Sequence, residues 1–236
     1  MNKTLIALAV SSLASWNAVA VITTVSPFTG DYSETFESFT VQAVSGAGAT
    51  ALDQAPIIGG LAKLQAANES GIYQNSGTTF SLGGSLAQVG TVNGGDRAFG
   101  SQNGTPGTVF FVEPVFKFGG YFGGYNGGAG SPKSTISATF YDFDSNFLET
   151  KTWNYNNLTG ALEWQGWEVT SGAGFGTIIF TDTDPTFQFD QFAMDDLQVV
   201  VPEMENWIVG CLLGGVVAFK GLREYRNRKL AVTVVA

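Results

Sequence analysis

TISATFYDFDSNFLETKTW, residues 135–153, carries the clearest strand pattern in this chain. From Thr135 to Phe140, apolar residues alternate with Thr and Ser, and a period of two is typical of a strand with one buried face. The residues from Asp142 to Asn146 favour a turn, because Asp and Asn side chains bond to nearby backbone. We therefore expect Phe147 to Trp153 to return as the second strand of a hairpin.

Two further stretches predict strands of the same kind. Thr177–Thr181 is rich in β-branched residues, which favours a central strand, and Leu197–Val201 has apolar residues at every second position, which predicts a last strand. Asn-Gly pairs at residues 93, 103 and 126 are typical of hairpin turns. These patterns predict an all-β fold with a single, jelly-roll-like β-sandwich.

The stretch from Ala51 to Ala67 follows a different pattern. Its apolar residues, from Ile57 to Leu64, recur at roughly helical spacing with polar residues between them. This spacing predicts either a short helix or a long loop that covers one edge of the sandwich.

The N-terminal residues 1–20 have the three parts of a secretory signal peptide in their usual order. A positive Met1–Lys3 precedes an apolar stretch that opens at Leu5, and Ala18-Val19-Ala20 fits a cleavage site. The alternative is a buried N-terminal strand. We expect a signal peptide at 1–20 and a secreted domain at 21–201.

The C-terminal residues place Pro202 and Glu203 before an apolar run, Trp207–Phe219, and a basic cluster follows it. This order predicts a membrane helix at about 206–222 with the cluster on the cytoplasmic side, and a tail at 230–236. The alternative is a terminal core helix. The cluster includes Lys220, Arg223, Arg226 and Arg228.

The layout of residues 202–229 resembles the PEP-CTERM sorting signal, which exosortase-type membrane transpeptidases read; Met204 stands where that motif usually has a second proline. The resemblance implies a non-catalytic protein that is exported through the inner membrane and anchored there before processing. It would then be sorted to the cell surface, where it associates with extracellular polysaccharide or biofilm matrix. Two alternatives stay open: a carboxylate-based enzyme acting on polysaccharide, and a purely structural surface protein.

Composition excludes several classes of function. Residues 21–201 carry 5 Lys and Arg against 17 Asp and Glu, a net charge of −12, and such a surface repels nucleic acid. The chain has no histidine, which excludes Ser-His-Asp and Cys-His catalysis and His-based zinc sites. Cys211 is the only cysteine, so the domain has no disulfide.

Acidic residues near the two ends of the domain predict a metal site. Glu37 in the first strands and Asp195 or Asp196 in the last strand resemble the calcium-binding pair of jelly-roll carbohydrate-binding modules. This resemblance implies a structural calcium as the one possible cofactor. The alternative is that these acids are solvated or hydrogen-bonded at strand ends.

Aromatic residues in two stretches predict glycan contacts. Phe118–Gly130, FGGYFGGYNGGAG, suits either a loop with its aromatics tucked against the sheet or a shelf on which sugar rings stack. In PEP-CTERM proteins, the similar Phe-Gly-aromatic pattern looks like part of a strand. In Glu163–Glu168, a period of two puts two Trp side chains on opposite faces, which allows one to lie in the core and one to be exposed; the alternative is a buried core position, which is more frequent for Trp. The predicted contacts are Tyr121, Tyr125, Trp164 and Trp167.

Overall fold

The computed structural model describes residues 20–40, 52–66, 70–74, 80–81, 88–90, 93–101, 104–124, 135–155, 161–170, 172–183 and 192–201. Residues 1–19 of the signal peptide predicted at 1–20 lie outside these ranges, and so does the predicted membrane helix. The same holds for the sorting residues Pro202, Glu203, Lys220, Arg223, Arg226 and Arg228. Within them, the structure contains no helix with the length and apolar character needed to cross a membrane.

One sheet has seven strands, in the order β1-β13-β10-β15-β8-β5, and β2 also pairs with β15. All of its strand pairs are antiparallel. Its strands are β1 (Ile22–Thr24), β2 (Tyr32–Glu34), β5 (Ser70–Gln74), β8 (Arg97–Ser101), β10 (Lys117–Gly124), β13 (Glu163–Val169) and β15 (Phe192–Val200).

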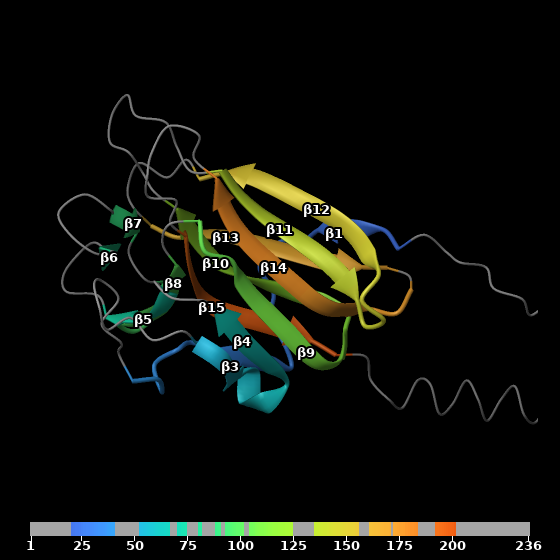
Figure 1. Ribbon diagram of the computed structural model, residues 1–236, viewed down its shortest axis with the longest axis horizontal. Coiled ribbons are helices and arrows are strands. Elements are labelled where there is room, and N and C mark those ends of the chain that lie inside the picture. The colour runs from blue at the N-terminus through green and yellow to red at the C-terminus, as the bar shows by residue number, and fades with distance from the viewer. Residues whose placement is uncertain are drawn as a thin grey trace, which may run out of the picture. The chain divides into compact units, whose positions relative to one another are not determined.

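The second sheet has six strands, in the order β12-β11-β14-β9-β4-β3 (Figure 1). Its strands are β3 (Leu52–Ile57), β4 (Ala62–Ala66), β9 (Gly107–Val115), β11 (Thr135–Asp142), β12 (Phe147–Asn154) and β14 (Phe175–Thr183). A separate pair is formed by β6 (Phe80–Ser81) and β7 (Gln88–Gly90).

The core lies between the inner faces of these two sheets and is mainly aromatic. Phe122 of the seven-stranded sheet stacks on Phe180 of the six-stranded sheet at 5.1 Å, and Trp167 meets Phe140 edge-on at 5.2 Å. All four side chains are almost fully buried. Each such side chain contributes about 1.5–3 kcal/mol by leaving water. The prediction of an all-β sandwich is confirmed, and its jelly-roll-like character stays a prediction.

The predicted hairpin is confirmed as β11 and β12. Ile136, Ala138 and Phe140 are buried while the alternating residues are half-exposed, as the period of two predicts. In the turn, the Asp142 carboxylate accepts hydrogen bonds from the backbone N–H and side-chain amide of Asn146. The predicted central strand at 177–181 is β14, which lies between β11 and β9, and the predicted last strand is β15.

The prediction for Ala51–Ala67 was wrong, because most of this stretch is a hairpin of β3 and β4 at the edge of the six-stranded sheet. A short 3-10 turn, η1 (Ile58–Gly60), joins the two strands, and Ile58, Gly59 and Gly60 all have positive φ. In β4, buried and exposed residues alternate with a period of two. The turn shifts the phase of the apolar pattern between the two strands, which produced the apparent helical spacing.

The expectation of a loop across Phe118–Gly130 was also wrong for its first half. Residues 117–124 form β10, which lies between β13 and β15 in the seven-stranded sheet. The strand expected from the resemblance is therefore present. Tyr125, one of the predicted glycan contacts, lies beyond β10 and outside the described residues.

Candidate functional site

Trp164 lies on the outer face of the seven-stranded sheet and is half-buried. Its indole covers Gly119 and Gly166, which pair with each other between β10 and β13. A Cβ atom at Gly119 would lie only 2.6 Å from the Trp164 ring. Because the two glycines have no side chains, the indole can lie directly against the backbone of the sheet.

Two more aromatic side chains contact this indole, and we call Phe28, Tyr121 and Trp164 the aromatic group. Tyr121 and Phe28 each meet Trp164 edge-on, with ring centroids 5.4 Å apart. The indole Nε1 donates a hydrogen bond to the Val25 carbonyl at 3.1 Å, which fixes the ring orientation. All three members are half-buried.

A charged pair lies beside the aromatic group. Lys117 Nζ is 3.6 Å from a carboxylate oxygen of Glu168, and it also lies 5.0 Å from the centroid of the Phe28 ring. The outer face here thus combines aromatic rings with one cationic donor and one anionic acceptor. Such a combination can bind a sugar through ring stacking and hydroxyl hydrogen bonds.

The prediction that Trp164 and Trp167 lie on opposite faces is confirmed, and it corrects one predicted glycan contact. Trp167 is only 1% exposed, and it packs among core rings that include Phe118 and Phe140. A ligand in solvent has no access to a side chain buried this way. Tyr121 and Trp164 are the two predicted contacts that the structure brings together.

Phe28 could not be predicted from the sequence, because it belongs to a segment that crosses the outer face of the sheet. This segment is held at its far end by Gly30, whose N–H donates to the Gln198 side chain at 3.0 Å, and by Asp31, whose N–H donates to the Val199 carbonyl at 2.8 Å. A Cβ at Gly30 would lie 2.4 Å from the Val199 oxygen. These contacts join distant parts of the sequence, so no local pattern reveals them.

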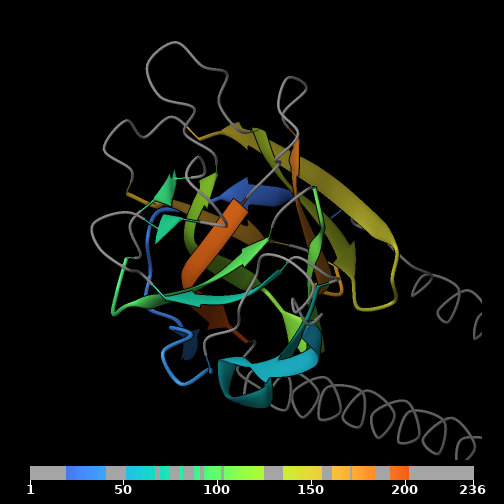
Figure 2. The ribbon, with the colours of Figure 1, turned by 60° about the vertical axis from the view of Figure 1, so that its left-hand side comes forward.

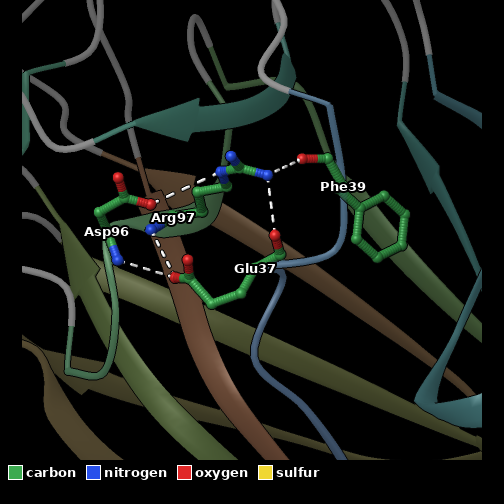
Figure 3. A network of polar contacts seen from close by, with 4 residues as sticks. All are labelled: Glu37, Phe39, Asp96 and Arg97. Carbon is green, nitrogen blue, oxygen red and sulfur yellow. Dashed lines mark hydrogen bonds and ion pairs between the residues drawn. The ribbon is translucent and has the colours of Figure 1, made fainter.

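Glu37, predicted as a metal ligand, binds the backbone of the loop at residues 93–97, which we call the anchored loop (Figure 3). Its Oε1 accepts hydrogen bonds from the N–H groups of Asp96 at 2.8 Å and Arg97 at 2.7 Å. In return, Arg97 Nη1 donates to the carbonyls of Glu37 and Phe39. Arg97 was also missed, since nothing local to it signals a partner some sixty residues away.

Asp195 and Asp196 bind the other half of the anchored loop. Asp195 is fully buried, and its Oδ2 accepts hydrogen bonds from the N–H groups of Asn93 at 2.9 Å and Gly94 at 3.3 Å. The side-chain amide of Asn93 donates to Asp196 Oδ2 at 2.6 Å. Asp196 itself has a φ of 46°, an uncommon conformation for a residue other than glycine.

The environment of Asp195 favours its protonated form. Burial, and then the charge of neighbouring Asp196, raise the pKa of Asp195 from 3.8 to about 7. Backbone hydrogen bonds from Asp196, Gly94 and Asn93 oppose this rise, but they do not outweigh the loss of solvation.

The structure does bring Glu37, Asp195 and Asp196 to one loop, but their geometry does not fit a shared calcium ion. Glu37 and Asp195 each direct a carboxylate oxygen at two backbone N–H donors of the anchored loop. Among the described residues, no three acidic or thiol side chains gather as a metal site requires. Calcium needs six to eight oxygen ligands, so the observed contacts favour the alternative of hydrogen-bonded acids.

Neither a family model nor a curated protein matches this chain. Among solved structures, it is similar to the K2 cleaved adhesin domain of Lys-gingipain (15% identity, 72% of this chain and 99% of that one, TM-score 0.45). It is also similar to a DUF4465 family protein from Bacteroides caccae (13% identity, 75% of this chain and 98% of that one, TM-score 0.41). A third similar structure is the CBM22-1 xylan-binding domain of Paenibacillus barcinonensis Xyn10C (11% identity, 75% of this chain and 100% of that one, TM-score 0.36). These likenesses are distant, and none assigns a ligand to this chain.

Proposed function

We propose that this chain is a non-catalytic, exported surface protein whose β-sandwich binds extracellular polysaccharide. The observation that carries the proposal is the aromatic group. Tyr121 and Trp164 are held together in half-exposed positions on an outer sheet face, where core packing alone does not require large rings. The flat indole offers a surface for the C–H face of a sugar ring.

The polar pair beside the rings supports the same ligand class. The Lys117 ammonium can donate to sugar hydroxyls, and the Glu168 carboxylate can accept from them. Because both side chains are partly exposed, the cost of removing them from water on binding is modest.

Asp195 is not placed to act as the acid of a glycoside hydrolase. A glycoside hydrolase requires two carboxyl groups about 5–5.5 Å or 6.5–9.5 Å apart across the scissile bond. Asp195, a carboxyl group with a raised pKa, is fully buried and bonded to the anchored loop. It therefore stabilises the fold and does not face a substrate.

Export and sorting are proposed from the two ends of the sequence. The predicted signal peptide at 1–20 would direct the chain through the inner membrane. The apolar run at 207–219 and its basic cluster would hold the chain there until an exosortase-type enzyme processes the signal at Pro202 and Glu203.

Isothermal titration of the full-length protein, purified in mild detergent, with a panel of neutral oligosaccharides tests the binding proposal. We expect Trp164→Ala to weaken binding roughly two- to tenfold, the value of one aromatic contact. The matched control is Tyr32→Ala, because Tyr32 is an exposed aromatic of β2 outside the aromatic group. Equal losses in both variants, or no binding by the wild type, would refute the proposal.

A further inference from the structure

A row of aromatic side chains crosses the outer face of the six-stranded sheet. Phe147 of β12 pairs with Tyr141 of β11, Tyr141 pairs with Thr177 of β14, and Thr177 pairs with Phe110 of β9. Lys63 of β4 pairs with Phe110, and on its other side it pairs with Pro56 of the edge strand β3. Paired residues point to the same face, so these five side chains lie side by side across five strands, over about 19 Å at ~4.8 Å per strand.

Solvent reaches all three rings of this aromatic row, to different extents. Phe147 is 62% exposed, although it also meets Tyr141 edge-on at 6.0 Å. Tyr141 and Phe110 are half-buried. Exposing a large apolar side chain to water costs free energy, and a bound partner that covers the side chain would remove this cost.

Two rows of hydroxyl side chains run beside the aromatic row on the same face. The nearer row pairs Thr150 with Thr139, whose hydroxyls are 3.1 Å apart, and it continues through the apolar Ile179 of β14 to Thr108 and Gln65. The farther row consists of Thr152, Ser137 and Thr181. Hydroxyl and amide groups can both donate and accept hydrogen bonds, as the hydroxyls of a sugar do.

The charge of this face differs from that of the domain. Residues 21–201 carry 17 acidic side chains, yet no described position in the three rows holds Asp or Glu. Lys63 supplies the charge within these rows, at one end. Rows with one lysine and no acid, bordered by the exposed Asp53 of β3, suit a neutral partner, whereas the rest of the acidic domain repels a polyanion.

A groove of about 270 Å³ lies at the Lys63 end of the aromatic row. Phe110, Val112 and Gln54 line it together with Lys63, whose Nζ donates to Gln54 Oε1 at 3.3 Å. Its volume is just below the usual range for small-molecule sites, about 300–1,000 Å³. It therefore suits one unit of a longer ligand better than a complete small ligand.

We propose that this outer face binds an extended, neutral polysaccharide that lies across the strands, along the aromatic row. Sugar rings stack on Phe147, Tyr141 and Phe110, and their hydroxyls bond to the Thr and Ser rows. One unit occupies the groove beside Lys63. The inference rests on the proposed polysaccharide-binding function, and it adds a second face and a preference for uncharged chains.

Affinity electrophoresis of the full-length protein in mild detergent tests this inference. The gels contain a neutral β-glucan, a neutral arabinoxylan or a polyuronate. We expect retardation in at least one neutral gel and none in the polyuronate gel. Combining Phe147→Ala with Tyr141→Ala should weaken the retardation roughly four- to a hundredfold, at two- to tenfold for each ring.

Two further variants keep the test independent of folding. Thr139→Val keeps the side-chain shape but removes a hydroxyl, so we expect a smaller loss of retardation at an unchanged melting midpoint. Tyr32→Ala, on the other sheet, should leave retardation unchanged.

Each remaining outcome separates this inference from the proposed function. If Trp164→Ala weakens retardation while the Phe147 and Tyr141 variants do not, the second face is wrong and the proposed function stands. Equal retardation by the polyuronate overturns the preference for neutral chains. If the variants change the sedimentation of the protein instead of its retardation, the face binds a second copy. No retardation of the wild type overturns both proposals.

Discussion

The buried carboxyl group of Asp195, in the last strand, makes the stability of the fold depend on pH. Its pKa is 3.8 in the unfolded chain and about 7 in the folded state, so between these values only the folded state keeps the proton. Its contribution to stability is therefore complete below about pH 4, and it is lost as the pH rises to about 7. The slope of this contribution is at most about 1.4 kcal/mol per pH unit.

Urea unfolding at several pH values checks this behaviour. Asp195→Asn carries no titrating proton and keeps one oxygen to accept from the anchored loop. We expect the free energy of unfolding to fall less steeply between about pH 4 and about pH 7 in this variant than in the wild type. Parallel curves for the two proteins would show that another group causes the dependence.

Calcium gives a second test at the same residues. Because Glu37 and Asp195 already bind N–H donors of the anchored loop, we expect the melting midpoint of the full-length protein to be the same in calcium and in EDTA. A midpoint that rises with calcium concentration would show that the folded state binds the ion, by mass action. It would restore the predicted calcium site and require the loop contacts to rearrange.

Residue patterns predicted which face of the sheet a side chain lies on better than they predicted which residues it contacts. The period of two correctly put Trp164 and Trp167 on opposite faces, since it depends only on the local backbone, but it did not say which of them lies in the core. It gave no indication of Phe28, because the contact between Phe28 and Trp164 joins two distant segments. The resemblance to jelly-roll carbohydrate-binding modules, and not the residue pattern, predicted that Glu37 and Asp195 come together, and neither predicted that one loop would bind both.

Among the elements, β10 depends on glycine to hold the aromatic group. Gly119→Ala would place a Cβ atom 2.6 Å from the Trp164 ring, so the indole must move away from the sheet. We expect a loss of about 1–3 kcal/mol in stability, as for other overpacked sites, and weaker binding of oligosaccharides. Urea unfolding and titration measure the two effects. Ser137→Ala, an outward position in β11, is the control for stability.

The edge hairpin of β3 and β4 shows why some elements were not predictable. Ile58, at the turn, has a φ of 56° and is fully buried, and the sequence has no signal for an isoleucine in this conformation. By contrast, the hairpin of β11 and β12 has a turn whose Asp and Asn chemistry is visible in the sequence. The pair β11–β12 was therefore predictable and the pair β3–β4 was not, while the Asn93-Gly94 turn signal was misleading, because it lies between β7 and β8, which do not pair with each other.

For the whole molecule, the proposed export and sorting predict two new chain ends. Mass spectrometry of the protein from an organism with an exosortase-type enzyme should find a start at Val21 and an end near Glu203. A mature chain that still runs to Ala236 would contradict processing. It would leave a membrane anchor as the only role of the C-terminal segment.

The central claim is that this β-sandwich binds neutral polysaccharide without cleaving it. The most direct test incubates the full-length protein with a panel of insoluble neutral polysaccharides and measures both bound protein and released reducing ends. We expect protein to be depleted from solution by at least one polysaccharide, with no reducing ends above the protein-free control. Release of reducing ends that grows with protein concentration, or no depletion by any polysaccharide, would contradict the claim.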